Sequence, residues 1–307
     1  MTREIPSGVI AMLVTPFDKD GRINFTALGE EIAWCVRNGA KGIVVTPSIG
    51  EFAVLSKSER VQCLEFCKDY ADKRYPDLYL IATIASTNTP ETIEYAHIAL
   101  SLGYDAGQLN PPYYWIPSKE EVYEYYAAVA TAELPIVVYD NPMLSKFDIT
   151  ARLAGRLAKI PGIIAMKEVK TDRQRELEPL FQAIRGRVKV YTTFRAFTTG
   201  MWLGSSGGFI NVFALPFCVK MWNMYQTGDL RAYRHMEEIQ SMVNTVFPRG
   251  GENNPNHIGT TKMAARVVTD IPMGAPRAPY RLPEHWVEEE LRAKLPQLQE
   301  LISRGNT

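Results

Sequence analysis

The sequence predicts an α/β protein built as a (β/α)8 TIM barrel with a C-terminal helical extension. Eight short apolar segments, each bounded by Gly, Pro, Asn or Ser, alternate with longer amphipathic segments over roughly the first 226 residues. Short apolar runs of this kind are typical of parallel strands that are covered on both faces. No G-x-G-x-x-G motif follows an expected strand, which removes the main support for an open dinucleotide-binding sheet. Eight alternating units therefore favour the closed barrel.

The expected elements follow from the apolar pattern and from the residues that bound it. The clearest helix covers 86–103, because a Ser/Thr/Asn cap region precedes Pro90 in the first turn and Gly103 ends the pattern. Further helical patterns cover 118–132, 172–186 (which Pro179 could kink) and, least clearly, 195–205. The expected strands lie within 8–17, 41–48, 79–86, 105–112, 135–142, 163–169, 188–194 and 207–215.

The chain divides into a barrel domain and a helical extension. Residues 1–226 are expected to form the barrel that carries the active site, and 227–307 show no strand alternation. In the extension, 230–247 and 283–304 have helical patterns. The glycine-rich "LGSSGGF" (203–209) enters the eighth strand from its N-terminal end, so we interpret it as a helix-to-strand turn and not as a phosphate site.

Composition limits the partners and the compartment. The 307 residues include 34 Lys plus Arg and 34 Asp plus Glu, and this balance argues against nucleic acid or an anionic membrane as the main partner. No apolar run is long enough to span a bilayer, and the N-terminus lacks the order of a signal peptide. A cytoplasmic location is therefore expected. The four cysteines, Cys35, Cys63, Cys67 and Cys218, are expected to be buried thiols and not a disulfide framework or a zinc site.

The strongest candidate for chemistry is Lys167, which ends the apolar strand "IIAMK". The period of two places Lys167 on the same face as Ala165, and Tyr139 ends the preceding strand in the same way. Active sites of such barrels lie at the carboxyl ends of the strands. A desolvated lysine loses its proton more easily and becomes a nucleophile towards a carbonyl, while a neighbouring phenol can transfer a proton. We therefore predict Lys167 and Tyr139 as the catalytic pair.

A structural interpretation of the same residues stays open. Lys167 could form an ion pair with a nearby carboxylate such as Glu168, and Tyr139 alone could be an ordinary core residue. Their occurrence together on adjacent strand ends favours the catalytic interpretation. No metal site is evident, because the histidines are scattered and form no H-E-x-x-H or H-x-H pattern: His97, His235, His257 and His285.

Other residues at the expected mouth of the barrel are candidates for substrate binding. The turn "TPSIGE" after the second strand offers the backbone N–H groups of Ser48 and Ile49 to a carboxylate. His257 lies in an expected long polar loop that could reach the mouth, and such loops often carry function. The remaining candidates, at the ends of the fourth and eighth strands, are Tyr114, Trp115, Asn211 and Phe213.

Five motifs resemble a known superfamily, the class I pyruvate aldolases that include N-acetylneuraminate lyase and dihydrodipicolinate synthase. The similarity covers nearly the whole chain and preserves the order and spacing of the motifs. They are "GVIAMLVTPFDKDGRIN", "PSIGE" (for G-T-T-G-E), "NPPYYWIPSKEEVYEYY", "VVYDNP" (for Y-N-x-P) and "IIAMKEVKTD" (for G-I-K-E-x-x-G-D). The resemblance implies that Lys167 forms a Schiff base with a 2-oxo acid such as pyruvate and that Tyr139 relays protons. It also implies carboxylate binding at Ser48–Ile49, no cofactor and a homotetramer.

Departures from the synthase pattern point to one branch of this superfamily. Ile49 replaces a threonine of the turn, which implies an interrupted hydroxyl relay, and Leu144 falls near the arginine that holds the synthases' second substrate. "NPMLSKFDI" and the segment from 246 to 286 are more similar to the hydratase-aldolase branch, of the trans-o-hydroxybenzylidenepyruvate hydratase-aldolase type. That branch usually has Asn where His257 aligns.

The resulting hypothesis is a carbon–carbon lyase. It would act on an aryl-substituted unsaturated 2-oxo acid and give pyruvate and an aldehyde. The alternatives are a dehydratase or deaminase of a 2-oxo sugar or amino acid derivative, a dihydrodipicolinate synthase-like condensation, or a non-catalytic 2-oxo acid sensor. Retention of both Lys167 and Tyr139 argues against the sensor.

Overall fold

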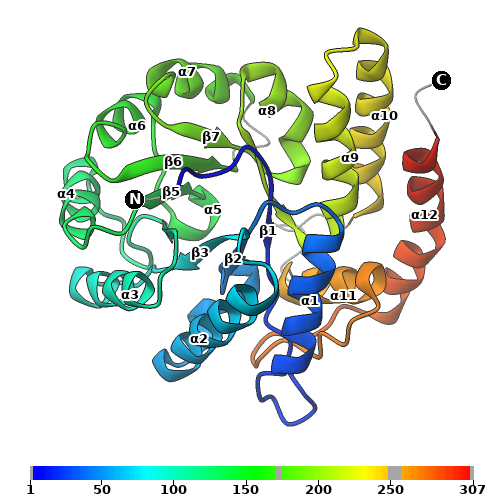
Figure 1. The fold of residues 1–307 in the computed structure, drawn as a ribbon, viewed down its shortest axis with the longest axis horizontal. Helices are drawn as coiled ribbons and strands as arrows, with labels where there is room; N and C mark the ends of the chain where they lie inside the picture. Colours follow the sequence, from blue (N-terminus) through cyan, green and yellow to red (C-terminus); the bar gives the residue numbers. More distant parts are fainter. Residues whose placement is uncertain (1–2, 170–173, 248–256, 305–307) are drawn as a thin grey trace.

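Eight parallel strands form a nearly closed barrel with helices between them, as the sequence predicts (Figure 1). The computed structural model describes residues 3–169, 174–247 and 257–304. Along the sheet the strand order is β7-β6-β5-β4-β3-β2-β1-β8. A bridge between Thr192 and Gly208 brings the two edges of the sheet together. The strands are β1 (Gly8–Met12), β2 (Gly42–Val45), β3 (Tyr79–Thr83), β4 (Ala106–Leu109), β5 (Ile136–Asp140), β6 (Ile163–Glu168), β7 (Lys189–Tyr191) and β8 (Gly207–Asn211).

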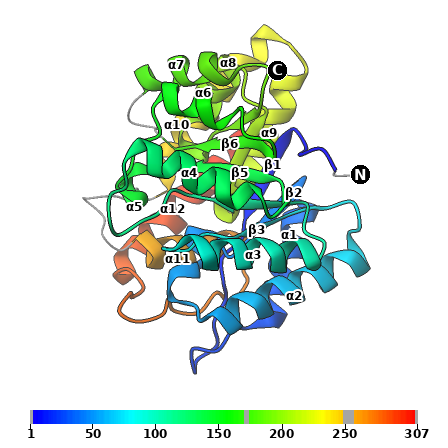
Figure 2. The same cartoon turned by 90° about the vertical axis from the view of Figure 1, so that its left-hand side faces the viewer.

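Each expected strand is present, and helices follow the strands around the outside (Figure 2). The 195–205 segment, the least clear of the expected helices, is confirmed as η3 and α8, and α7 runs across Pro179. The helices of the barrel are α1 (Phe25–Arg37), α2 (Lys57–Arg74), α3 (Thr89–Ser101), α4 (Lys119–Ala130), α5 (Pro142–Ser145), α6 (Ala151–Leu157), α7 (Gln174–Ile184), α8 (Phe197–Leu203) and α9 (Leu215–Gln226). Short 3-10 turns are η1 (Ser48–Gly50), η2 (Phe52–Val54), η3 (Phe194–Ala196) and η4 (Val212–Ala214).

Strand alternation divides the apolar core into two regions. In β1, Val9 and Ala11 join the large cluster between strands and helices, whereas Ile10 and Met12 belong to a smaller cluster inside the barrel. The other strands contribute to the inner cluster in the same way, with Val44, Ile81, Ala106, Val137, Ala165, Tyr191 and Phe209. The side chains inside the barrel thus form a packed core up to the layer in which the strands end.

The closest backbone approach in the barrel wall explains one glycine of "LGSSGGF". Gly207 is paired with Gly8 on the neighbouring strand, and a Cβ atom on Gly207 would lie 1.8 Å from the Gly8 carbonyl oxygen. Gly207 also has φ +138°, which side chains rarely allow. These two requirements support the interpretation of this segment as a turn into β8.

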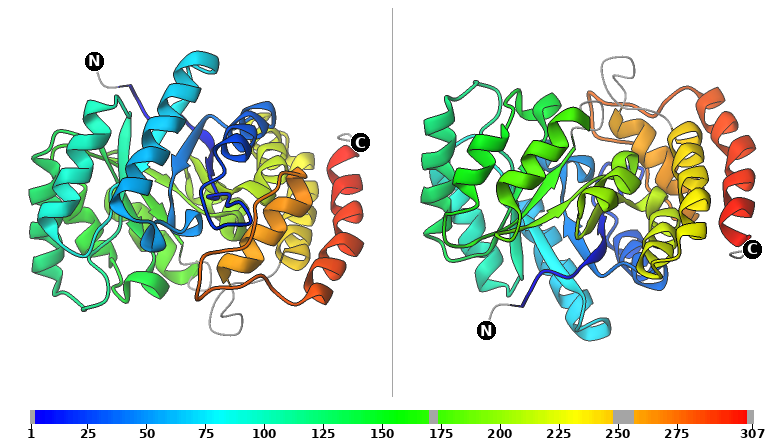
Figure 3. Two further views of the ribbon diagram at one scale, coloured as in Figure 1. Left: turned by 90° about the horizontal axis from the view of Figure 1, so that it is seen from below. Right: turned by 90° about the horizontal axis from the view of Figure 1, so that it is seen from above.

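The C-terminal extension consists of α10 (Leu230–Val246), α11 (His257–Thr269) and α12 (His285–Ser303). Helix α10 packs against α9, α11 contacts η4 after β8, and α12 packs outside α10 at the edge of the molecule (Figure 3). His257, which the sequence predicts in a long polar loop, is instead the first residue of α11. Residues 259–265 are all buried, and this burial supports a helix there. The preceding part of that loop, 248–256, lies outside the described residues.

Two expectations from composition can be compared with the structure. All four cysteines are free and buried, as expected. Of the helices that the structure describes, none is both long enough and apolar enough to cross a membrane.

Candidate active site

Lys167 lies at the carboxyl end of β6 with its amine inside the barrel. Its side chain is only 1% exposed. The Nζ atom lies 2.9 Å from Sδ of Met12 and 3.7 Å from the centre of the Tyr139 ring. Phe209 lies farther away, at 5.8 Å from Nζ to the ring centre. A thioether and two aromatic rings therefore surround an amine that the sequence analysis expected to be nucleophilic.

This apolar environment changes the protonation of the amine. Burial lowers the pKa of Lys167 from 10.5 to about 7, and no carboxylate of the described ranges opposes the shift. Glu168 therefore does not act as a counterion for Lys167, although it is buried next to it in sequence. An amine with a pKa near 7 is about half neutral at neutral pH, so it can attack a carbonyl.

Tyr139 is the register partner of Lys167 on β5, as predicted from the shared strand face. Its hydroxyl oxygen accepts a hydrogen bond from Nδ2 of Asn141 at 2.7 Å and also shares one with the Ser48 hydroxyl. Burial raises the pKa of Tyr139, while the bonds to Asn141 and Ser48 act in the opposite direction. The Tyr139 phenol therefore keeps its proton at neutral pH and is held by two polar neighbours.

These hydrogen bonds add one residue to the predicted site. The hydroxyl next to Tyr139 belongs to Ser48, and the interruption of a hydroxyl relay by Ile49 stays a prediction. Asn141 was not predicted as a site residue. It lies two residues after Tyr139, and its place directly after a strand is the only signal for it. Beyond the end of a strand, alternation no longer predicts which way a side chain points.

The turn at Ser48–Gly50 is built to expose backbone donors. The N–H groups of Gly50 and Glu51 bond within the turn, to the carbonyls of Pro47 and Ser48. The N–H groups of Ser48 and Ile49, at its start, have no hydrogen-bond partner in the described part of the chain. The Ile49 side chain belongs to the inner core, which anchors the turn above the barrel. Carboxylate binding by these two donors remains a prediction.

A buried ion pair fixes this turn to the C-terminal extension. Oε1 of Glu51 lies 2.9 Å from Nζ of Lys262 on α11, and both side chains are almost fully buried. The other Glu51 oxygen accepts the backbone N–H of Arg277 at 3.0 Å, and Lys262 also donates to the carbonyl of Ala275 at 3.2 Å. Glu51 itself has φ +65°, a left-handed conformation that is uncommon for a side-chain-bearing residue. Lys262 was not predicted as a site residue, because it lies far from Glu51 along the chain and the sequence does not show that the two residues meet.

Three other predicted binding residues, Asn211, Phe213 and His257, differ in their burial and in their neighbours. Asn211 is buried at the inner end of β8, opposite Met12. Phe213 is buried in the outer cluster, where its ring contacts Phe194 and Phe247 at 5.3 and 4.6 Å between centres. His257 is partly buried near Arg195; burial and then the positive charge of Arg195 lower its pKa, so His257 is mostly neutral at neutral pH.

Tyr114 and Trp115 stand at the surface of the single chain, 79% and 80% exposed. Their rings contact each other edge to face, at 5.2 Å between centres. Together with Tyr113, Thr87 and Glu121 they line a surface pocket whose lining includes neither Lys167 nor Tyr139. Their role in a substrate pocket remains a prediction.

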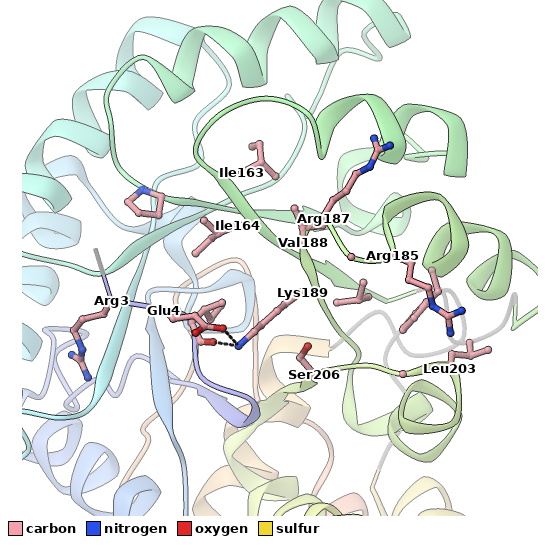
Figure 4. Close-up of a pocket in the computed structure, with 16 residues that line it drawn as sticks. Arg3, Glu4, Ile163, Ile164, Arg185, Arg187, Val188, Lys189, Leu203 and Ser206 are labelled. Atoms are coloured by element: carbon pink, nitrogen blue, oxygen red, sulfur yellow. Dashed lines mark hydrogen bonds and ion pairs between the residues drawn. The ribbon is translucent and has the colours of Figure 1, made fainter. Parts of the chain in front are cut away.

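A second pocket, of about 740 Å³, lies at the opposite end of the barrel (Figure 4). Its lining comes from segments that precede strands, including Arg3, Lys189 and Ser206. Lys189 already donates to the carbonyl of Ile5 at 2.6 Å and pairs with Glu4 at 2.8 Å (Figure 4). This N-terminal mouth is remote in the fold from the strand ends that carry Lys167. No group of three His, Cys, Asp or Glu residues that could bind a metal occurs in the described ranges.

A buried lysine beside a tyrosine at the carboxyl ends of barrel strands defines the class as aldolase-type lyases with a TIM barrel. A profile of the dihydrodipicolinate synthetase family matches residues 5–299. The 4-hydroxy-tetrahydrodipicolinate synthase of Rhodospirillum centenum is 30% identical over 239 residues, covering 76% of this chain and 79% of that protein. The chain belongs to the dihydrodipicolinate synthetase family.

Solved structures agree with this assignment. Dihydrodipicolinate synthase from Acinetobacter baumannii, complexed with pyruvate, has a TM-score of 0.83 at 27% identity and covers 96% of this chain and 99% of its own. A sialic acid aldolase from Ruminococcus gnavus has a TM-score of 0.84 at 22% identity, covers 97% and 98%, and supports the fold alone. The family itself is shown by the profile match and by the relative from Rhodospirillum centenum.

The buried amine predicts a stability gain when it is removed. The pKa of Lys167 is lower in the folded than in the unfolded chain, so unfolding takes up a proton between about pH 7 and 10.5 and stability rises with pH in that window. Lys167→Met should therefore be more stable than the wild type at pH 7 by a few kcal/mol, up to about 5. Urea unfolding at pH 7, 8.5 and 10 would measure this. A difference that does not shrink with rising pH would contradict the burial argument.

Proposed function

We propose that the protein forms an imine between Lys167 and the carbonyl of pyruvate and uses it to make or break a carbon–carbon bond, without a cofactor. The observation that carries this proposal is the buried Lys167 amine, which has a lowered pKa, has no carboxylate partner among the described residues and lies 3.7 Å from the Tyr139 ring. Pyruvate is supported by membership of the family and by the relative from Acinetobacter baumannii that is complexed with it.

The residues around the amine suit each step of this chemistry. The neutral amine attacks the ketone carbon, and loss of water gives the imine. The protonated imine withdraws electrons from the neighbouring carbon, which can then lose a proton and attack an aldehyde, or release one in the reverse direction. Tyr139 would move the proton, with Ser48 and Asn141 holding its hydroxyl in place. The N–H groups of Ser48 and Ile49 would hold the carboxylate of the 2-oxo acid.

The identity of the electrophile, the aldehyde that reacts with the pyruvate imine, is supported by fewer observations than pyruvate itself. The family and the names of its relatives favour a synthase-like condensation. The apolar side chains of Met143 and Leu144, about half exposed on α5 directly after Tyr139 and Asn141, instead favour an aryl-bearing aldehyde and the hydratase-aldolase reaction. Both reactions share the pyruvate imine. A dehydratase or deaminase would also use an imine on Lys167, but this imine would form with the carbonyl of its own 2-oxo substrate.

The imine can be tested directly. Borohydride in the presence of pyruvate should reduce the imine and leave one covalent adduct on Lys167, found by peptide mass spectrometry. The initial rate of labelling should rise through about pH 7 and level off above it, because only the neutral amine attacks. Lys167→Ala should not be labelled, whereas Lys189→Ala, at the other end of the barrel, should be labelled as the wild type is. A Lys167→Ala protein that is still labelled and active would overturn the proposal.

A panel of aldehydes would identify the electrophile. Pyruvate consumption is measured with aromatic aldehydes, with a short carboxylate-bearing aldehyde and with polyhydroxylated aldehydes. Preference for aromatic aldehydes, lost in Leu144→Arg, would support the hydratase-aldolase reaction. Preference for the carboxylate-bearing aldehyde in the wild type would support the condensation. A protein that binds pyruvate and turns over none of the substrates, in either direction, would be a sensor.

We also propose a homotetramer. Tyr114, Trp115 and Ile116 form an exposed apolar patch on the single chain, and such patches are commonly covered in assemblies. Sedimentation velocity should show four chains, and Trp115→Glu should produce smaller species. A monomer in the wild type would exclude the assembly. Wild-type sedimentation of Trp115→Glu would exclude this patch as its contact.

A further inference from the structure

Two polar side chains inside the barrel lack hydrogen-bond partners. Gln108 on β4 is 1% exposed, and neither its amide nitrogen nor its amide oxygen has a partner among the described residues. Thr83 on β3 is 2% exposed, and the same holds for its hydroxyl. Buried polar groups are nearly always hydrogen-bonded, because leaving them unpaired loses their interactions with water. Two such residues side by side therefore need an explanation.

Strand register places this pair on the inner face of the barrel. Thr83 and Gln108 are register partners, and each lies two residues after an inner-core residue, Ile81 and Ala106 respectively. Gln108 is in turn the partner of Val137, which lies two residues before Tyr139 on β5. Their side chains therefore point to the barrel axis about one layer below Tyr139 and Lys167. The two polar groups form a floor beneath the catalytic pair.

The chemistry of this floor indicates its ligand. An amide offers two donor hydrogens and an acceptor, and a hydroxyl can donate and accept. No charge is present in this set, which suits a small neutral molecule rather than a carboxylate or a cation. Water requires two to four polar partners at a buried site, and Gln108 and Thr83 supply them. The hydroxyl of Thr46, buried at the end of the neighbouring β2, is a third group without a partner in the described chain.

The other identified neighbours of the amine are less suited to this role. Met12 Sδ and the faces of the Tyr139 and Phe209 rings lie around Nζ of Lys167, and a thioether or a ring face binds water only weakly. The Tyr139 hydroxyl is already hydrogen-bonded to Asn141 and Ser48. A substrate bound from the mouth would cover the amine from above, and the floor then offers donors and acceptors that have no protein partner in the described chain.

We propose that Gln108 and Thr83 hold a water molecule beneath Lys167 and that this water is the one exchanged at the imine. This inference rests on the proposed imine. In imine hydrolysis the oxygen of this water bonds to the carbon of the protonated imine, and one of its protons passes to the nitrogen. As the carbon–nitrogen bond of this adduct breaks, its hydroxyl gives up the remaining proton to solvent, so the water oxygen becomes the carbonyl oxygen and the neutral Lys167 amine is restored. Imine formation runs through the same site in reverse, and the expelled water occupies the position between Gln108 and Thr83.

The test follows the exchange of water oxygen into pyruvate. In water enriched in oxygen-18, mass spectrometry measures enzyme-dependent labelling of the pyruvate carbonyl above the uncatalysed background. Gln108→Met, which keeps the side-chain volume, should slow labelling by at least about tenfold, because the water is no longer positioned. Thr83→Val should also slow it. The amount of borohydride-trapped adduct after long incubation with pyruvate should stay unchanged. Loss of the water site slows imine formation and imine hydrolysis by the same factor, so the equilibrium amount of imine does not change.

A matched control is available at Gln240. This glutamine is also buried, but its amide bonds to the N–H groups of Phe197 and Thr198 and to the carbonyl of Phe194. Gln240→Met should lower the urea midpoint, because it breaks satisfied hydrogen bonds, and leave exchange by the folded protein unchanged. Gln108→Met should not lower the midpoint.

The outcomes separate this inference from the function on which it rests. Absence of any borohydride adduct in the wild type would remove the imine itself. An adduct in the wild type with wild-type exchange in either folded variant, Gln108→Met or Thr83→Val, would overturn the water site. A fall in the midpoint of Gln108→Met as large as that of Gln240→Met would show that Gln108 is bonded structurally, which would also overturn it.

Discussion

The site depends on the burial of the Lys167 amine, which is removed from water without a counterion in the described part of the chain. Lys167 contacts a thioether and aromatic rings, and this burial alone lowers its pKa to about 7. A carboxylate at the same place would raise the pKa and hold the amine protonated. Burial of an unpaired lysine opposes folding, so the surrounding barrel must supply stability elsewhere. The large apolar cluster between the strands and the outer helices provides it.

A second buried lysine plays the contrasting role. Lys262 is also inside the protein but is paired with Glu51 and bonded to a carbonyl, so its charge is compensated. This ion pair holds the strained turn that carries Ser48, and Ser48 in turn holds Tyr139. The C-terminal extension is thereby connected to Tyr139. The packing of α11 against the end of the barrel therefore belongs to the site as well as to the fold.

The barrel was predictable because the apolar periodicity of each strand and helix, and the residues that bound it, can be recognised in a short stretch of sequence. Alternation along β5 and β6 also sufficed to pair Tyr139 with Lys167, since register partners on adjacent strands share a face. Alternation gives no direction beyond a strand end, which is why Asn141 was missed. It also says nothing about contacts between distant segments, so Lys262 was missed, and His257 was placed in a loop although it begins α11.

The sequence by itself determined the order of the elements, the barrel, the pairing of Tyr139 with Lys167 and the family, because these depend on periodicity and on short motifs. Only the tertiary structure decided the environment of the amine, the hydroxyl that meets Tyr139 and the unpartnered amide of Gln108 below it. These properties depend on which side chains from different strands meet at the barrel axis. The physical reason is that desolvation and hydrogen bonding are set by all neighbours in space, and most of those neighbours are far apart along the chain.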